Sequence, residues 1–301
     1  MRAGALAPVW PRLVLAIVKS QISALLPSRL KVPLHRLRGR ARSLWAQKRG
    51  PQSVWFWDHY EQAALEIIYS VGQAGVTLRD KVVADIGSGD GIMALGVANR
   101  GRPARLVGFD IVRTDVDHLS KRAREEGVRR TMPAELSFVQ SIPERLPAVE
   151  GEFDVAYTWS AFEHIQNPLA VLKETRRILK QDGVLFLQLW PFYYSDRGSH
   201  LWDWFPEPFH HLSESSDKIV DAMRHSSVAD EAWTEYMIRE FESLNRITLD
   251  DLQDALVAAE FDVVRLELLT QIVAIPRHLA RSVRLTNLAI GGVKLLAVPR
   301  P

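Results

Sequence analysis

The 301-residue sequence predicts an α/β domain whose mostly parallel sheet is covered by helices on both faces. From residue 82 onward, short apolar runs typical of strands alternate with amphipathic runs of helical period. The strand candidates are 82–86, 106–111, 136–140, 153–159, 184–189, 263–269 and 293–298. The helix candidates among them lie near 91–100, 115–126, 168–180 and 248–260, and another helix is expected over 54–74.

The segment 191–245 breaks this alternation of strands and helices. Connections in such folds usually take about 2–6 residues, so an interval of this length is expected to be functional. Residues 191–212 are rich in aromatic side chains and histidines, and 213–245 has a helical pattern. We expect an insertion whose aromatic side chains line a substrate pocket and cover it as a lid. The alternative is that the same aromatic residues form a homodimer interface.

Charge is distributed unevenly along the chain. Residues 1–50 hold eleven Lys and Arg and no acidic residue, which leaves 38 − 11 = 27 basic against 36 acidic residues, or −9, in the remainder. The sequence has no cysteine, which excludes disulfides, thiolate metal sites and a cysteine nucleophile. The chain therefore combines a basic arm with an acidic body.

The arm over 1–50 has apolar residues at roughly helical spacing, but its longest apolar run, 13–18, is far short of the ~20 residues that span a bilayer. Three interpretations remain open: an interfacial helix on an anionic membrane surface, docking onto the acidic body or a partner subunit, and an organellar transit peptide. Nucleic-acid binding is not expected, because stacking aromatics are not interleaved with the basic residues. We expect a cytoplasmic protein with peripheral membrane association as an option.

The stretch Val-Val-Ala-Asp-Ile-Gly-Ser-Gly-Asp-Gly at 82–91 predicts a buried strand, a tight glycine turn and a helix start. Glycine permits positive φ and lets a ligand approach the backbone. A dinucleotide fingerprint would need a third glycine at position 92, where Ile92 stands instead. Asp110 ends the next strand, where a carboxylate can accept both hydroxyls of a ribose.

Together, Asp85, the glycines and Asp110 resemble the class I S-adenosylmethionine (SAM) dependent methyltransferases, over roughly residues 80–190 and more loosely 246–301. The resemblance implies a Rossmann-like seven-stranded sheet with an antiparallel final strand, and SAM as the cofactor. Asp85 would hold the glycine turn or its bound water, and Asp110 would take the ribose hydroxyls. The methionine and ribose portion of SAM would pass beside Gly87, Gly89 and Gly91.

Two further segments extend the resemblance. The stretch 138–147 is similar to the family's third-strand segment, but Ile142 stands where an Asp often binds the adenine amino group, which implies apolar contact with adenine. Trp159, at the end of the fourth strand, is assigned to the cofactor as well. Residues 160–165, followed by Pro168, are similar to the family's Glu-His-x-x-x-Pro box.

A general base for methyl transfer should lie at the carboxyl ends of the fourth and fifth strands, where ligands gather in open α/β sheets. His164 fits by position, although its pair with Glu163 could instead serve only to hold the loop. The insertion supplies His200 and His210 as further catalytic candidates. Because the spacing of His200, Asp203 and His210 is not diagnostic, no metal is expected.

The sequence therefore predicts a SAM-dependent methyltransferase that acts most readily on a hydroxyl oxygen of a small-molecule, sugar or lipid-linked acceptor. The alternatives are a methyltransferase-like scaffold subunit and, less favoured, a nicotinamide-dependent dehydrogenase, which Ile92 argues against. The expected organisation is an arm at 1–50, a SAM-binding domain at 51–190 and 246–301, and a lid at 191–245.

Overall fold

A computed structural model describes residues 46–301, which form parts of two units, Met1–Gln62 and Ala63–Pro301. The basic arm predicted for 1–50 lies outside the described residues, apart from its end at 46–50. In the first unit, helix α3 (Pro51–Trp57) leads into a π-helical segment, η1 (Asp58–Ala63). The Phe56 and Tyr60 rings stack there, with centroids 5.3 Å apart. The helix predicted over 54–74 ends as α4 (Ala64–Gly72).

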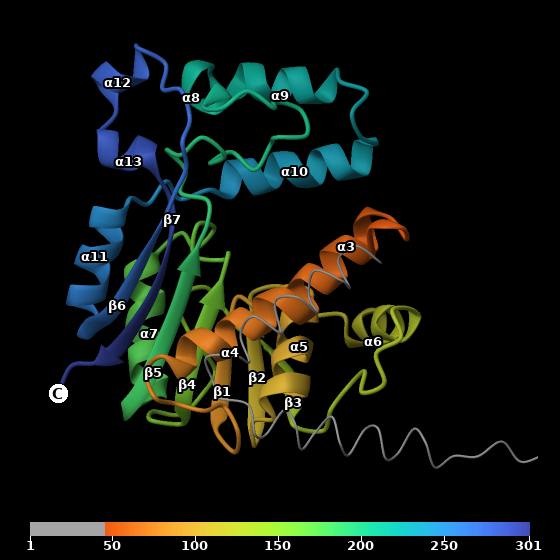
Figure 1. Ribbon diagram of the computed structural model, residues 1–301, viewed down its shortest axis with the longest axis vertical. Helices are drawn as coiled ribbons and strands as arrows, with labels where there is room; N and C mark the ends of the chain where they lie inside the picture. The colour runs from red at the N-terminus through yellow and green to blue at the C-terminus, as the bar shows by residue number, and fades with distance from the viewer. Residues whose placement is uncertain (1–45) are drawn as a thin grey trace, which may run out of the picture. The chain divides into compact units, whose positions relative to one another are not determined.

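The second unit is built on a seven-stranded sheet of order β3-β2-β1-β4-β5-β7-β6, shown in Figure 1. Neighbouring strands pair in parallel except for β7, which is antiparallel to both β5 and β6. This confirms the predicted fold class and its antiparallel final strand. The strands are β1 (Val82–Ile86), β2 (Arg105–Asp110), β3 (Leu136–Gln140), β4 (Phe153–Trp159), β5 (Leu179–Leu189), β6 (Phe261–Thr270) and β7 (Ile290–Pro299).

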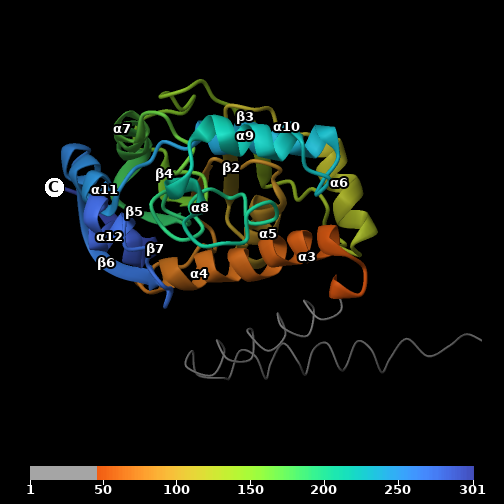
Figure 2. The ribbon, with the colours of Figure 1, turned by 90° about the horizontal axis from the view of Figure 1, so that it is seen from above.

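Helices cover both faces of the sheet, as Figure 2 shows from above. Helices α4 and α5 (Ile92–Gly101) lie on one face, and α7 (Pro168–Ile178) and α11 (Leu249–Ala258) lie on the other, while α6 (Val116–Glu125) lies beyond β3. Capping explains three of the helix starts, because Asp115, Asn167 and Thr248 each accept an N–H of the first turn. The strands between these layers bury a continuous apolar core.

The insertion folds as a helical layer beyond the carboxyl ends of β4 and β5 (Figures 1 and 2). It contains α8 (His210–Ser213), α9 (Ser216–Arg224) and α10 (Glu231–Ser243), each of which lies in the segment expected to be helical or aromatic-rich. A core of its own joins the loop after β5 to these helices, through Tyr193, Leu201, Ile219, Val220, Met223, Ile238, Phe241 and Leu244. Because this core is separate from that of the sheet, the insertion is a body packed over the strand ends rather than an extended loop.

Two local predictions were wrong. The helix expected to reach residue 180 ends at Ile178, because Leu179 takes an extended conformation and pairs with Phe153, which starts β5 at Leu179. The strands at the far edge are also longer than predicted, since β6 and β7 pair along almost their whole length. Two short helices that the apolar pattern did not separate, α12 (Leu279–Ser282) and α13 (Leu285–Ala289), precede β7. Over residues 46–301, none of the helices has the length and apolar character needed to cross a membrane.

Candidate functional site

The glycine turn between β1 and α5 has the backbone conformation that its sequence predicted. Gly87, Gly89 and Gly91 have φ values of 79°, 52° and 78°. A Cβ on Gly91 would lie 2.6 Å from the Phe138 ring, so this glycine is required by packing. A Cβ on Gly89 would meet nothing within 4 Å, so the backbone there faces open space. The turn thus combines one glycine locked into the core with one exposed to a ligand.

Asp110 at the end of β2 is tied to this turn by its side chain. Its Oδ2 accepts the Gly89 N–H at 2.8 Å, and its Oδ1 accepts the Val112 N–H at 2.9 Å. An ionised carboxylate offers about four lone-pair sites, so each oxygen keeps one for a ligand hydroxyl. Asp110 therefore stands beside the open backbone of Gly89 with acceptor capacity for a pair of hydroxyls.

Asp85, the last acidic residue before the turn, is fully buried. Neither of its carboxylate oxygens has a hydrogen-bond partner of normal geometry, although the Tyr157 hydroxyl faces it and favours the ionised form. Burial is the main reason that the pKa of Asp85 rises to about 8, and the charges of Asp110 and Asp90 raise it further. A buried acceptor without a partner is the feature expected of a group that waits for a ligand or a bound water.

Apolar side chains lie exposed after β2 and β3, next to these carboxylates. Ile111, Val112 and Ile142 expose 57%, 68% and 64% of their surface. The two segments are held together because Ser141 N–H donates to the Asp110 carbonyl oxygen at 2.8 Å. This apolar patch stands where the resemblance places adenine. Trp159 has other neighbours. The centroid of its ring lies 6.3 Å from that of Phe186, and the Lys294 ammonium lies 5.9 Å from its ring centre.

The Glu-His box after β4 is held by the end of the insertion. The Asn245 side-chain amide donates to the carbonyl oxygens of Phe162 and Ile165, each at 2.7 Å. Its backbone N–H donates to the carbonyl oxygen of Glu163 at 2.8 Å. Three hydrogen bonds from one residue therefore fix the loop that carries His164.

His164 has a tautomer that its hydrogen-bond network assigns. Its Nδ1 lies 2.7 Å from the Ser243 hydroxyl, which itself donates to the Glu240 carbonyl oxygen at 2.8 Å. The hydroxyl must therefore accept the Nδ1 proton, and Nε2 of the neutral ring keeps a lone pair. Burial lowers the pKa of His164, while the Glu240 carboxylate, 3.5 Å from Nε2, partly offsets this.

His200 from the insertion approaches the same ring. The two imidazole centroids are 5.2 Å apart with an edge-to-face geometry. His200 has positive φ, and its Nε2 is buried with no hydrogen-bond partner. Burial, followed by the nearby His164 and His211, lowers the pKa of His200 to about 3. Both rings are therefore neutral at pH 7, but His200, with a pKa of about 3, is a weak base and is better suited to hold a hydroxyl than to take its proton.

Glu163 completes this cluster with the two rings. It is buried, neither carboxylate oxygen has a hydrogen-bond partner, and burial raises its pKa to about 8. Glu163, His164 and His200 bring ligand atoms within 4.8 Å of one another, an arrangement that could converge on a metal ion. The expectation of no metal stays a prediction, and the set considered from sequence, with Asp203 and His210, is not the set that the fold gathers.

His210 lies apart from this cluster in its contacts. Its ring stacks on Phe205 with centroids 4.3 Å apart and an interplanar angle of 7°. The adjacent His211 is buried, and its Nε2 lies 2.6 Å from the Tyr193 carbonyl oxygen. The structure thus brings His164 and His200 together and gives the two later histidines packing partners within the insertion.

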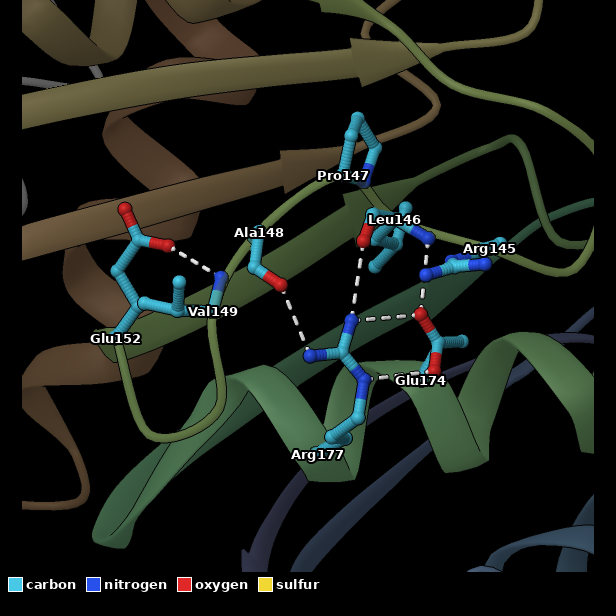
Figure 3. Close-up of a pocket in the computed structure, with 8 residues that line it drawn as sticks. All are labelled: Arg145, Leu146, Pro147, Ala148, Val149, Glu152, Glu174 and Arg177. Carbon is cyan, nitrogen blue, oxygen red and sulfur yellow. Dashed lines mark hydrogen bonds and ion pairs between the residues drawn. The ribbon is translucent and has the colours of Figure 1, made fainter.

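A surface depression of about 670 Å³ lies elsewhere, between the loop after β3 and the end of α7 (Figure 3). Its charged groups are already paired, because Arg177 donates to Glu174 and to the carbonyl oxygens of Leu146 and Ala148. Glu152 at its rim accepts the Val149 N–H. The shifted pKa values in its lining come from pairs of this kind: the hydrogen bond with Arg177 lowers the pKa of Glu174, and Glu174 raises the pKa of Arg177. Despite burial, the hydrogen bond with Arg105 lowers the pKa of Glu152. Ion-pair networks of this kind are structural, so this depression is not a candidate active site.

Sequence reasoning missed three residues of the histidine side: Glu240, Ser243 and Asn245. Each lies at the end of α10 or just after it, far along the chain from the Glu-His box. No spacing in the sequence marks them, because their roles depend on how the insertion folds back over β4.

With this geometry in place, comparisons with known proteins identify the domain. Residues 84–187 match the family model described as a methyltransferase domain. The chain is similar to the ubiquinone biosynthesis O-methyltransferases of Actinobacillus pleuropneumoniae serotype 7 (strain AP76) and Haemophilus ducreyi, both at 32% identity. These matches cover 35% and 36% of this chain and 44% of each relative, so the chain matches less than half the length of these relatives.

Solved structures with similar chain traces include geranyl diphosphate methyltransferase in complex with SAM, at 14% identity and a TM-score of 0.49, covering 79% of this chain and 85% of that one. The [4+2]-cyclase SpnF has 17% identity and a TM-score of 0.49, covering 80% and 82%. Over residues 84–187 this chain is therefore similar to a methyltransferase domain, the class that its glycine turn and Glu-His box predict.

Proposed function

We propose that this protein transfers the methyl group of SAM to a hydroxyl oxygen of a small-molecule, sugar or lipid-linked acceptor. The observation that carries the proposal is the charge of the glycine turn. Beyond the effect of burial, Asp110 and Asp90 both lie close enough to Asp85 to raise its pKa electrostatically, beside the open backbone of Gly89. The acidic side chains of Asp90 and Asp110 would repel the pyrophosphate of a nicotinamide cofactor, whereas they suit a ligand with a sulfonium and an ammonium group. Asp85, whose pKa is raised to about 8, is mostly protonated at pH 7 and adds little to this charge before a cationic ligand binds.

The residues on this side fit SAM in three ways. Gly89 leaves room beside the backbone, Asp110 has acceptor capacity for the ribose hydroxyls, and buried Asp85 has two unpartnered oxygens. The exposed apolar side chains of Ile111 and Ile142 suit the face of adenine. Trp159 stays a further cofactor-binding candidate, although the neighbours described above lie toward β5 and β7.

Bound there, SAM supplies an activated methyl group whose displacement needs little covalent work from the protein. Methylation of an acceptor hydroxyl would release its proton, so the chain must supply a proton acceptor beside the bound hydroxyl. His164 Nε2 is the proton acceptor that the network prepares, because its Nδ1 proton is held by Ser243. The Glu240 carboxylate, 3.5 Å away, then stabilises the imidazolium that forms.

His200 is the second catalytic group, because its unpartnered Nε2 can hold the acceptor hydroxyl beside His164. His210 stays a weaker candidate, since it stacks on Phe205. Aromatic side chains of the insertion exclude water from this region, and α10 lies over the strand ends as a lid. Tyr236 of α10 links the two sides, because burial raises its pKa to about 12, with Glu240 and then Asp90 of the glycine turn adding to the shift.

Two observations support an oxygen acceptor. The relatives that match residues of this domain are named O-methyltransferases of ubiquinone biosynthesis, which act in the synthesis of a small molecule. The neutral His164 imidazole, beside the unpartnered Nε2 of His200, suits binding and deprotonation of a hydroxyl at neutral pH. The scaffold alternative would leave these unpartnered basic groups without a use, and the family match favours a methyltransferase over the dehydrogenase alternative.

The test separates cofactor binding from transfer. Isothermal titration should show that SAM binds the wild type and His164→Ala equally. Incubation of the protein with tritiated SAM and a cell extract should then label a small or lipid-soluble molecule with the wild type but not with His164→Ala. If the wild type binds no SAM, or if both proteins label the same product at the same rate, the proposal fails.

The arm at 1–50 is tested separately. We propose, from its charge alone, that it adds affinity for an anionic membrane surface. Flotation with vesicles that contain anionic lipid should recover the full chain and should lose it when residues 1–50 are deleted. Equal flotation of the two proteins would contradict this role and would favour docking to a protein surface.

A further inference from the structure

The edge strand β6 exposes an unusual amount of apolar surface. Val263, Val264, Leu266 and Leu268 each expose between 42% and 57% of their side chains. Among the described strands, β6 pairs with β7 alone, so the backbone groups along its other edge face outward. Natural edge strands are usually short, bulged or interrupted by Lys or Pro. β6 runs from Phe261 to Thr270 without Lys or Pro, and between its register irregularities at Val263/Arg265 and Leu269/Thr270 the segment 265–269 pairs regularly with β7. Such an edge is expected to be covered.

The sequence of β6 is self-complementary in an antiparallel arrangement. The central residues read Val264-Arg265-Leu266-Glu267-Leu268. If two copies pair about a two-fold axis at Leu266, each Arg265 faces Glu267 of the other strand, and Leu266 faces its own copy. Val264 then faces Leu268. Every opposite pair is therefore either a salt bridge or an apolar contact, and the register sets no like charges against each other.

The fold places these pairs on suitable faces of the sheet. Arg265 Nη1 donates to the Gln73 side chain just after α4 at 2.9 Å, and Glu267 stands opposite Lys294, which pairs with Glu66 of α4. The charged pairs thus lie on the α4 face. The apolar side chains of Leu266 and Leu268 alternate to the opposite face. Arg265 keeps free donors in its guanidinium group, because Gln73 takes one of them.

We propose that β6 is the interface of a homodimer, in which two copies of this chain continue the sheet through antiparallel β6–β6 pairing. The partner is a second copy rather than a foreign strand, because the order of charged and apolar residues matches itself. The aromatic insertion, which lies beyond the carboxyl ends of β4 and β5, stays available for the acceptor in this arrangement.

The experiment uses two charge reversals that are each unfavourable alone and favourable together. In an Arg265→Glu dimer, position 265 of each copy sets one acidic side chain against another, the Glu267 of the other copy. In a Glu267→Arg dimer, the same two contacts set basic side chains against each other. Mixed in equal amounts, the two variants restore both salt bridges, but only as a heterodimer. Because one strand pair is a small interface, the full chain is sedimented over a range of ~1 to ~100 µM. The wild type should be dimeric in this range, and the dimer dissociation constant of each variant alone should be at least tenfold higher.

The mixture should recover the dimer, with one tagged variant retaining the other on affinity resin. Arg281→Glu, a charge reversal on exposed α12, is the matched control and should leave the dimer intact. SAM binding of each variant reports that its domain is folded. A wild type that stays monomeric over the whole range would overturn the proposal. So would single variants that dimerise as well as the wild type, or a mixture that stays monomeric.

Discussion

The cofactor side of the site takes its polar groups from a compact stretch of sequence, residues 85–112, whereas the histidine side takes them from three distant segments. On the first side, backbone N–H groups and carboxylates of β1, β2 and their loops hold one another. On the second, the loop after β4 is tied to the start and end of the insertion. This difference teaches that the cofactor half can be inherited as a motif, while the acceptor half must be assembled by the particular insertion of this chain.

The largest effect expected is on transfer without an effect on cofactor binding. His164→Ala removes the proposed base, so turnover should fall by about 10²–10⁴-fold. The SAM dissociation constant, measured by titration calorimetry, should stay unchanged, because no contact of His164 reaches the glycine turn. His210→Ala is the matched control and should retain most of the activity, since that ring stacks on Phe205. If EDTA abolished turnover of the wild type, the reaction would depend on a metal ion rather than on His164 as a base.

A substitution on the cofactor side should instead weaken SAM binding. Asp110→Ala removes both the proposed ribose acceptor and the anchor of Gly89, so SAM affinity should fall by about 10- to 100-fold. Calorimetry measures this directly, and Asp117→Ala, on the exposed first turn of α6, is a control that should bind normally. An unchanged dissociation constant for Asp110→Ala would move the cofactor away from this turn.

A smaller effect is expected when the link between the insertion and the Glu-His loop is removed. Asn245→Ala removes two side-chain hydrogen bonds that hold the Glu-His loop. Because buried carbonyl oxygens lose their partners, the free energy of unfolding should fall by about 1–3 kcal/mol. Turnover should fall together with it while SAM affinity is kept. Chemical denaturation and initial rates measure the two effects, and normal turnover in a destabilised variant would show that the loop needs no such anchor.

The pH dependence of stability should reflect the buried Asp85. Its folded pKa, raised to about 8, lies above the value in the unfolded chain, so the folded state binds a proton more tightly between about pH 4 and 8. Stability of the SAM-free protein should therefore fall as pH rises through that window, with a contribution of up to ~1.4 kcal/mol per pH unit. Asp85→Asn should flatten this slope in denaturation curves, and an equal slope in both proteins would contradict the assignment.

The pH dependence of turnover is the mildest expected effect. The base must be neutral, and burial lowers the pKa of both His164 and His200. Activity should therefore persist below the usual histidine range of about 6.5 before it declines in acid. A kcat/KM profile that already falls as pH drops toward 7 would show that neither buried imidazole is the base.

The cofactor side could be predicted from the sequence to a much larger extent than the histidine side. The strand, turn and carboxylate of the cofactor side are local, so Asp85, the glycines and Asp110 could be placed from their order alone. The seven-stranded sheet and its antiparallel final strand followed from the resemblance, and the strand pairing confirms both. Glu240, Ser243 and Asn245 could not be found, because their contacts depend on α10 folding back over β4. For the same reason His164 could be paired with His200 only once the insertion was placed.

The most direct test of this account is a single-turnover assay with tritiated SAM and acceptor-containing extract, run in parallel with SAM titration on the same proteins. The account predicts that wild type binds and transfers, that His164→Ala binds but does not transfer, and that Asp110→Ala loses transfer because it loses binding. Transfer by His164→Ala at the wild-type rate, or a wild type that does not bind SAM, would contradict the division of the site into a cofactor side and a histidine side.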